Sequence, residues 1–81
     1  MSGLRSKLKR IEVDPKILGG KPVVKGTRVP VYLVVELLAS GMSEGEILKE
    51  YPSLRRDDIR AALEYASKIL RDQEVIPIEA Q

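Results

Sequence analysis

The sequence predicts a mostly α fold, in which a three-helix, helix-turn-helix core is preceded by a short β element. Three segments with helical boundary signals follow one another at residues 31–40, 44–51 and about 55–72, and a brief linker separates the last two. That succession is typical of a helix-turn-helix. Short β-branched pieces at 11–13 and 23–24 come before the helices. The 81 residues suffice for one small domain.

The first part of the chain predicts a basic arm followed by two short strands. Residues 1–10 are basic and lack periodicity, so we expect a flexible arm, which either lies along phosphates or only aids solubility. Residues 11–13 alternate in polarity as a strand does, and Asp14-Pro15 ends that strand. Residues 23–24 predict the second strand. Two strands this short need a third strand or a partner chain, which favours a homodimer.

The stretch from Gly19 to Val31 predicts a shaped, cationic loop, because it combines three glycines, two prolines and three cations. Such a loop either binds something or only reverses the chain. The candidate structural residues are Gly20, Lys21, Pro22, Gly26, Thr27 and Arg28. The guanidinium of Arg28 offers five donors, so we expect it to fasten the loop to backbone carbonyls, to Asp14 or to Glu36.

The first predicted helix covers residues 31–40, between Pro30, which suits a helix start, and Gly41, which suits a helix end. Its side chains are almost all apolar, so we expect it to lie centrally in the fold or at a dimer interface. The second helix begins at a capping box of Ser43 and Glu46 and ends at Tyr51-Pro52. A hydrophobic contact between Met42 and Ile47 is expected to fix its start.

The third predicted helix begins near residues 55–57 and ends near 71–73, with Asp57 and Asp58 suited to its positive end. Its apolar stripe consists of Ile59, Ala62, Leu63, Ala66, Ile69 and Leu70. Residues 11–72 therefore form the predicted domain, and residues 73–81 form a C-terminal tail. A proline among the β-branched residues of the tail argues against a central strand. The tail either packs back, stays loose or adds to another protein as an extended peptide.

Composition argues against an enzyme. The chain has no Cys and no His, which excludes disulfides and thiolate sites and removes the usual metal ligand and general base. We therefore expect no cofactor and no metal. No apolar run approaches the roughly 20 residues of a membrane span and no signal-peptide pattern opens the chain, so we expect a cytoplasmic protein.

The distribution of charge and the order of the helices together raise DNA as a partner. Residues 1–28 hold eight cations against two acids, whereas residues 29–81 hold six cations against ten acids. The basic third suggests an anionic partner, or only a solvated surface. In a helix-turn-helix, the first turns of the last helix meet the DNA. The candidate DNA-binding residues are Arg55, Arg56, Arg60, Lys49, Lys9 and Arg10. Against this reading, Asp57 and Asp58 share the same turn, and the three helices can equally form an ordinary core.

Several strings of this sequence resemble a known family. The quoted segments are Ile11-Glu12-Val13-Asp14-Pro15, the run Gly19-Gly20-Lys21-Pro22-Val23-Val24-Lys25-Gly26-Thr27-Arg28-Val29-Pro30-Val31, Gly41-Met42-Ser43 and Tyr51-Pro52-Ser53-Leu54. Over about residues 11–66 the chain resembles the domain of unknown function 433 family. The resemblance implies a homeodomain-like helical fold preceded by a small β element. It also implies a VapB-like antitoxin that binds DNA at its own promoter and neutralises a PIN-like nuclease toxin.

Two departures from the family pattern bear on these expectations. Arg55 stands where the family often has Ser or Thr as the cap of the third helix, so we expect a less regular helix start. The chain after Leu70 lies outside the similarity. Two hypotheses follow: a dimeric DNA-binding antitoxin of a toxin-antitoxin pair, or a small dimeric protein-interaction module that does not bind DNA.

Overall fold

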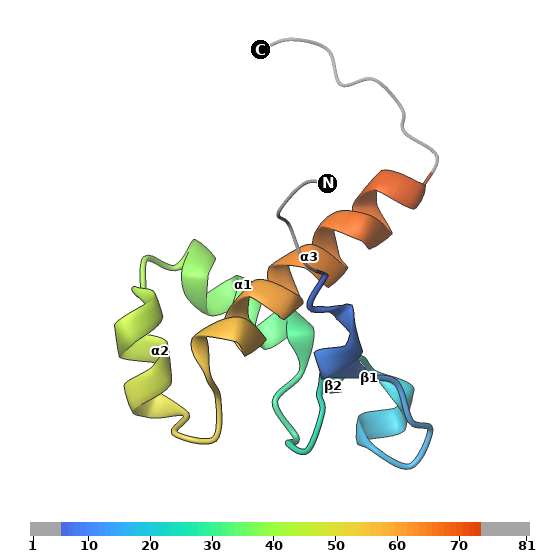
Figure 1. Ribbon diagram of the computed structural model, residues 1–81, viewed down its shortest axis with the longest axis horizontal. Coiled ribbons are helices and arrows are strands. Elements are labelled where there is room, and N and C mark those ends of the chain that lie inside the picture. The colour runs from blue at the N-terminus through green and yellow to red at the C-terminus, as the bar shows by residue number, and fades with distance from the viewer. Residues whose placement is uncertain (1–5, 74–81) are drawn as a thin grey trace, which may run out of the picture.

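The computed structural model describes residues 6–73, which form three helices preceded by a small β element (Figure 1). This confirms the predicted mostly α fold. The elements, in chain order, are the 3-10 turn η1 Leu8–Arg10, the strand β1 Ile11–Glu12, the 3-10 turn η2 Leu18–Gly20, the strand β2 Val23–Val24, and the helices α1 Val31–Ala39, α2 Glu44–Glu50 and α3 Arg56–Asp72. The predicted boundaries of the helices agree with these within one or two residues.

Helix α1 is bounded by the two residues that the sequence singled out. Pro30 has extended backbone angles and precedes the first helical residue. At the other end Gly41 adopts φ 103°, and its N–H donates to the Leu38 carbonyl while the N–H of Met42 donates to the Leu37 carbonyl. These two bonds form a Schellman motif, which satisfies carbonyls that a helix end would otherwise leave without partners.

Helices α2 and α3 begin differently. The predicted capping box of α2 is complete: the Glu46 N–H donates to the Ser43 hydroxyl at 3.1 Å, and the Ser43 N–H donates to the Glu46 carboxylate at 2.8 Å. At α3 only the second half of such a box exists, since an Arg55 side chain has no acceptor. The Asp58 carboxylate accepts the Arg55 N–H at 2.8 Å. The acid therefore anchors a helix start that lacks a Ser or Thr cap.

The two strands lie antiparallel, with Ile11 opposite Val24 and Glu12 opposite Val23. Val23 also forms a bridge to Pro30, and both valines of β2 are fully buried. The buried core joins this element to the helices and comprises Val23, Val24, Val31, Val34, Ile47, Leu54, Ile59, Ala61 and Ala62. Helix α3 contacts β1 directly, so the chain itself covers the sheet. Packing against α3 thus supports the two short strands within one chain, and the homodimer stays a prediction.

Residues 6–10 differ from the expected flexible arm. Turn η1 lies against α3 (Figure 1), where Arg10 and the preceding Lys7 pair with acids of that helix. Residues 7–10 are thus packed against the helical core. Residues 1–5 and 74–81, which hold the rest of the predicted arm and nearly all of the predicted tail, lie outside the described part of the chain.

Helix α3 extends past α1 (Figure 1). With 17 residues against nine, α3 is about 26 Å long and α1 about 14 Å long at a rise of 1.5 Å per residue. The early part of the predicted apolar stripe, Ile59 and Ala62, is buried, but Leu63, Ile69 and Leu70 are exposed. The shorter helix does not reach the second half of the stripe.

Candidate nucleic-acid interface

The start of α3 presents three exposed arginines. Arg56 and Arg60 stand four residues apart and therefore share one helical face, while Arg55 immediately precedes the helix. Arg56 donates to the Glu44 carboxylate of α2 at 2.8 Å. A solvent-exposed pair of this kind contributes at most about 1 kcal/mol, so a phosphate competes readily with Glu44 for the guanidinium.

The two acids of the same turn face turn η1. Arg10 binds the Asp58 carboxylate at 3.0 Å and reaches Asp57 at 3.5 Å, and the ammonium of Lys7 lies 3.5 Å from Asp57. Asp58 is only 6% exposed. At 100° per residue, Asp57 and Asp58 project about 100° and 200° around the axis from Arg56. Lys7 and Arg10 therefore offset the negative charges of the two aspartates, which would otherwise repel the phosphates of DNA. These aspartates project from a different side of the helix than Arg56 does.

A further contact fastens η1 two turns along α3. The Lys7 backbone N–H donates to the Glu64 carboxylate at 2.8 Å. This bond lowers the pKa of Glu64, with smaller contributions from a hydrogen bond to Ser6 and from the Lys7 charge, while partial desolvation opposes the shift. Sequence reasoning missed this partnership. No local pattern signals it, because the two residues are 57 positions apart.

The six candidate DNA-binding residues do not form one patch. Arg55, Arg56 and Arg60 gather at the start of α3, and Arg10 lies next to them but is engaged by the two acids. Lys9 is exposed and borders a basic surface hollow of about 410 Å³ beside η1. Lys49 lies in the last turn of α2, in a separate hollow that it shares with Glu46 and Glu50. The geometry therefore favours the three arginines and Lys9 over Arg10 and Lys49.

Thr27, not Arg28, fastens the loop after β2. Its hydroxyl donates to the Val24 carbonyl at 2.8 Å and accepts the Val29 N–H at 3.0 Å. Gly26, at φ 82°, occupies the position of a turn that requires a positive φ. Within residues 6–73, Arg28 makes no hydrogen bond or ion pair, and it is exposed beside a hollow of about 530 Å³. The expectation that it binds carbonyls, Asp14 or Glu36 is not met, because a short hydroxyl at position 27 already satisfies the turn.

The base of this loop is closed by backbone hydrogen bonds. The Val31 N–H donates to the Pro22 carbonyl at 2.9 Å, and the Val24 N–H donates to the Val29 carbonyl at 3.0 Å. Just before the loop, the ammonium of Lys21 lies 5.5 Å from the ring centroid of Tyr32, within the range of a cation–π contact. The predicted shaped loop is thus a small hairpin joined to the start of α1.

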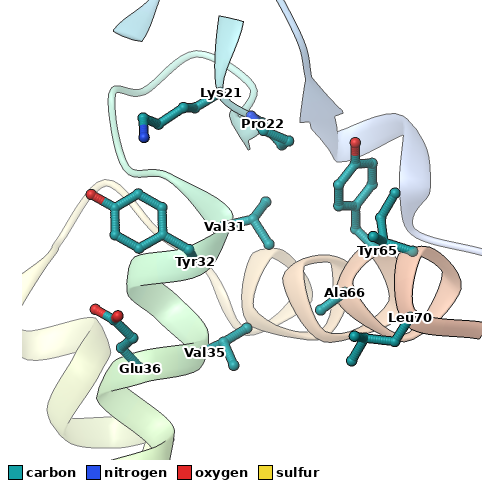
Figure 2. A pocket seen from close by; sticks show the side chains of 10 residues that line it. Lys21, Pro22, Val31, Tyr32, Val35, Glu36, Tyr65, Ala66 and Leu70 are labelled. Atoms are coloured by element: carbon teal, nitrogen blue, oxygen red, sulfur yellow. The ribbon is translucent and has the colours of Figure 1, made fainter. Parts of the chain in front are cut away.

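An apolar groove of about 450 Å³ opens where α3 runs past α1 (Figure 2). In Figure 2, Pro22, Val31 and Val35 border one side of the groove, and Tyr65, Ala66 and Leu70 border the other. Tyr32, Glu36 and Lys21 stand at its rim. The sequence held a signal for this surface, since the apolar stripe of α3 continues for two turns beyond the length that α1 can cover.

Comparison with known proteins places these features in context. The model of a family described as "Protein of unknown function (DUF433)" matches residues 11–66. An uncharacterized protein, y4eO, of Sinorhizobium fredii is 54% identical over 53 residues, which are 65% of this chain and 24% of that protein. An uncharacterized protein of Archaeoglobus fulgidus is 58% identical over 24 residues, which are 30% of this chain and 67% of that protein.

A solved structure has a similar fold. The crystal structure of a DUF433 member protein from Anabaena variabilis matches with a TM-score of 0.72 at 31% identity, over 76% of this chain and 61% of that one. This chain thus spans about a quarter of the Sinorhizobium protein and about three fifths of the Anabaena protein. In the part of the chain that the structure describes, no helix has the length and apolar character needed to cross a membrane.

Proposed function

The chain belongs to the DUF433 family of proteins of unknown function, and we propose that it is the DNA-binding antitoxin of a toxin-antitoxin pair. One observation carries the DNA-binding half of this proposal. At the start of α3, Arg55, Arg56 and Arg60 are exposed, whereas the neighbouring acids are engaged by Lys7 and Arg10.

The arrangement suits the reading of a major groove by α3. In a helix-turn-helix the first turns of the last helix contact base edges, while neighbouring cations contact phosphates. An arginine that binds a guanine edge through two hydrogen bonds contributes about 1–3 kcal/mol of discrimination, and phosphate contacts add salt-dependent affinity. Arg56 and Arg60 occupy adjacent turns of one face, which is the spacing that successive base or phosphate contacts require.

The antitoxin half of the proposal is supported by the resemblance of the quoted sequence strings to the DUF433 family, which implies a VapB-like antitoxin. The expected partner is a PIN-like nuclease toxin encoded beside this protein, and the expected DNA is the promoter that the two share. Co-expression tests this half directly: the neighbouring nuclease should arrest growth alone and should be neutralised, and co-purify, when this protein is present.

Binding to the protein's own upstream DNA, measured by fluorescence anisotropy at low salt, tests the DNA-binding half. The double variant Arg56→Ala, Arg60→Ala should lose at least about tenfold in affinity while staying folded. The double variant Lys16→Ala, Arg28→Ala is the matched control, because it removes the same charge from exposed positions away from α3. Wild-type protein that fails to bind this fragment at low salt, alone and with its toxin, would contradict DNA binding.

A protein-interaction module without DNA binding is the second candidate function. The apolar groove between α1 and α3 favours it, since contiguous exposed apolar surface on a small domain marks an interaction site. The two candidates differ in the DNA measurement. The module predicts that neither the arginine variant nor the wild type distinguishes the upstream fragment from unrelated DNA.

A further inference from the structure

We propose that the groove between α1 and α3 is a homodimer interface, in which a second copy of this chain lays the end of its α3 antiparallel across the first. The interface residues on α3 are those that border the groove, Tyr65, Ala66, Ile69 and Leu70. On α1 they are Val31, Tyr32 and Val35. Neither the second copy as partner nor the groove as its contact surface follows from DNA binding itself.

The shape of this face suits a copy of itself. A two-fold interface uses the same patch on both subunits, so the patch must supply both a hollow and the group that fills it. Here Leu70 is 64% exposed and Ile69 is 42% exposed, and both protrude at the edge of the groove that Val35 and Ala66 line. The small Ala66 lets a second helix approach closely, so that the exposed leucine and isoleucine of each copy fill the hollow of the other.

The charges around the groove are complementary under the same two-fold symmetry. Glu36 stands at the rim and makes no hydrogen bond or ion pair with any residue of the described range 6–73, and Lys21 stands at the rim beside Tyr32. The last turn of α3 carries the exposed Arg71, whereas its neighbour Asp72 accepts a hydrogen bond from the Lys68 ammonium at 3.2 Å. A second copy laid across the groove therefore brings the Arg71 cation to a rim that presents the Glu36 carboxylate.

The length of α3 supports the same interface by a second route, which rests on the proposed DNA binding. The groove-lining residues of α3 are centred between positions 67 and 68. Two α3 helices that cross antiparallel at this point place their first residues about 34 Å apart along the helix direction, at 1.5 Å per residue. Half-sites in successive major grooves lie about 34–36 Å apart. When its two α3 helices run along the DNA axis, the same dimer that covers the groove spaces the two sets of arginines for one helical turn of DNA.

Sedimentation equilibrium of the full chain, without DNA or toxin, tests the interface over concentrations up to about 100 μM. Wild-type protein should be a dimer at the upper end of this range. Leu70→Glu should weaken self-association at least about tenfold, because it places a carboxylate in the apolar contact. Leu63→Glu is the matched control and should leave the dimer intact, since it puts a carboxylate in place of an exposed leucine of the same helix but outside the groove lining.

A charge exchange makes the test specific for the antiparallel arrangement. Glu36→Arg and Arg71→Glu should each weaken the dimer, and their combination should restore it, because the double variant recreates the opposite charges at both symmetric positions. Two unrelated destabilising effects would add instead. A double variant that associates more weakly than either single variant overturns the proposed orientation.

The remaining outcomes separate this interface from other occupants and from the proposed function. A wild-type monomer throughout the concentration range overturns the interface. If deleting residues 74–81 then makes the groove accessible to an apolar dye, the occupant is the chain's own tail. A dimer that obeys the two variant tests yet fails to bind the upstream DNA supports the interface and contradicts DNA binding. A monomer that binds a single half-site contradicts the interface and supports DNA binding.

Discussion

At the scale of single residues, Thr27 shows how a short side chain replaces a long one. The guanidinium of Arg28 has more donors, but a donor next to a tight turn is useful only if an acceptor lies within its reach. The hydroxyl of Thr27 both donates and accepts within three residues of itself, to the Val24 carbonyl and from the Val29 N–H. Within residues 6–73, Arg28 is left exposed and makes no hydrogen bond or ion pair.

Replacing Thr27 with valine should therefore destabilise the domain, although the two side chains have the same shape. The Val29 N–H and the Val24 carbonyl each lose a partner, which lowers the free energy of unfolding by about 1–3 kcal/mol. Urea denaturation measures this change. Arg28→Ala is the neighbouring control and should lie within about 0.5 kcal/mol of wild type. If the two substitutions lowered the free energy of unfolding equally, Arg28 would stabilise the loop as much as Thr27 does.

At the scale of elements, the sequence predicted what depends on near neighbours. The stop at Gly41, the capping box at Ser43 and the start after Pro30 are each determined by residues within one turn, so the helix boundaries could be foreseen. The position of η1 could not, because Arg10 and Asp58 are 48 positions apart and each looks like an ordinary surface charge in the sequence. The groove lies between these cases: its apolar stripe and the unequal lengths of the two helices were visible in the sequence, but the way in which α1 and α3 pack against each other was not.

Helix α2 supplies the element-scale prediction. It has only seven residues, so its start contributes much of its stability. Ser43→Ala removes the acceptor for the Glu46 N–H and should lower the free energy of unfolding by about 0.5–2 kcal/mol. Ser53→Ala, at an exposed position in the next linker, serves as the control and should have little effect. If both serines behaved alike in denaturant titrations, the capping box would not be what anchors α2.

At the scale of the whole molecule, turn η1 and the preceding Lys7 join the first part of the described chain to helix α3. Lys7 and Arg10 neutralise Asp57 and Asp58, and the Lys7 backbone binds Glu64. The same contacts stabilise the start of α3 and remove negative charge from beside the three arginines. Stability and the proposed DNA contact therefore depend on one cluster.

Arg10→Ala should thus have two effects. It leaves the nearly buried Asp58 carboxylate without its cation, which lowers the free energy of unfolding by about 1–3 kcal/mol. It also restores the repulsion between these acids and phosphate, so the variant should bind the upstream DNA more weakly under conditions where it is still folded. Lys9→Ala, the adjacent exposed cation, should leave thermal stability unchanged. A loss of stability in Lys9→Ala as large as in Arg10→Ala would contradict the specific pairing.

The contacts that Lys7 and Arg10 make with α3 form a clasp, which also has a consequence for the order in which the chain folds. Helices α1 and α2 are neighbours in the chain, whereas the clasp joins residues about 50 positions apart and must wait for loop closure. During synthesis, the cations of η1 leave the ribosome well before the acids that they bind. Lys7 and Arg10 therefore cannot bind these acids until α3 emerges. The loop closure that joins them also offsets the acids beside the arginines of α3.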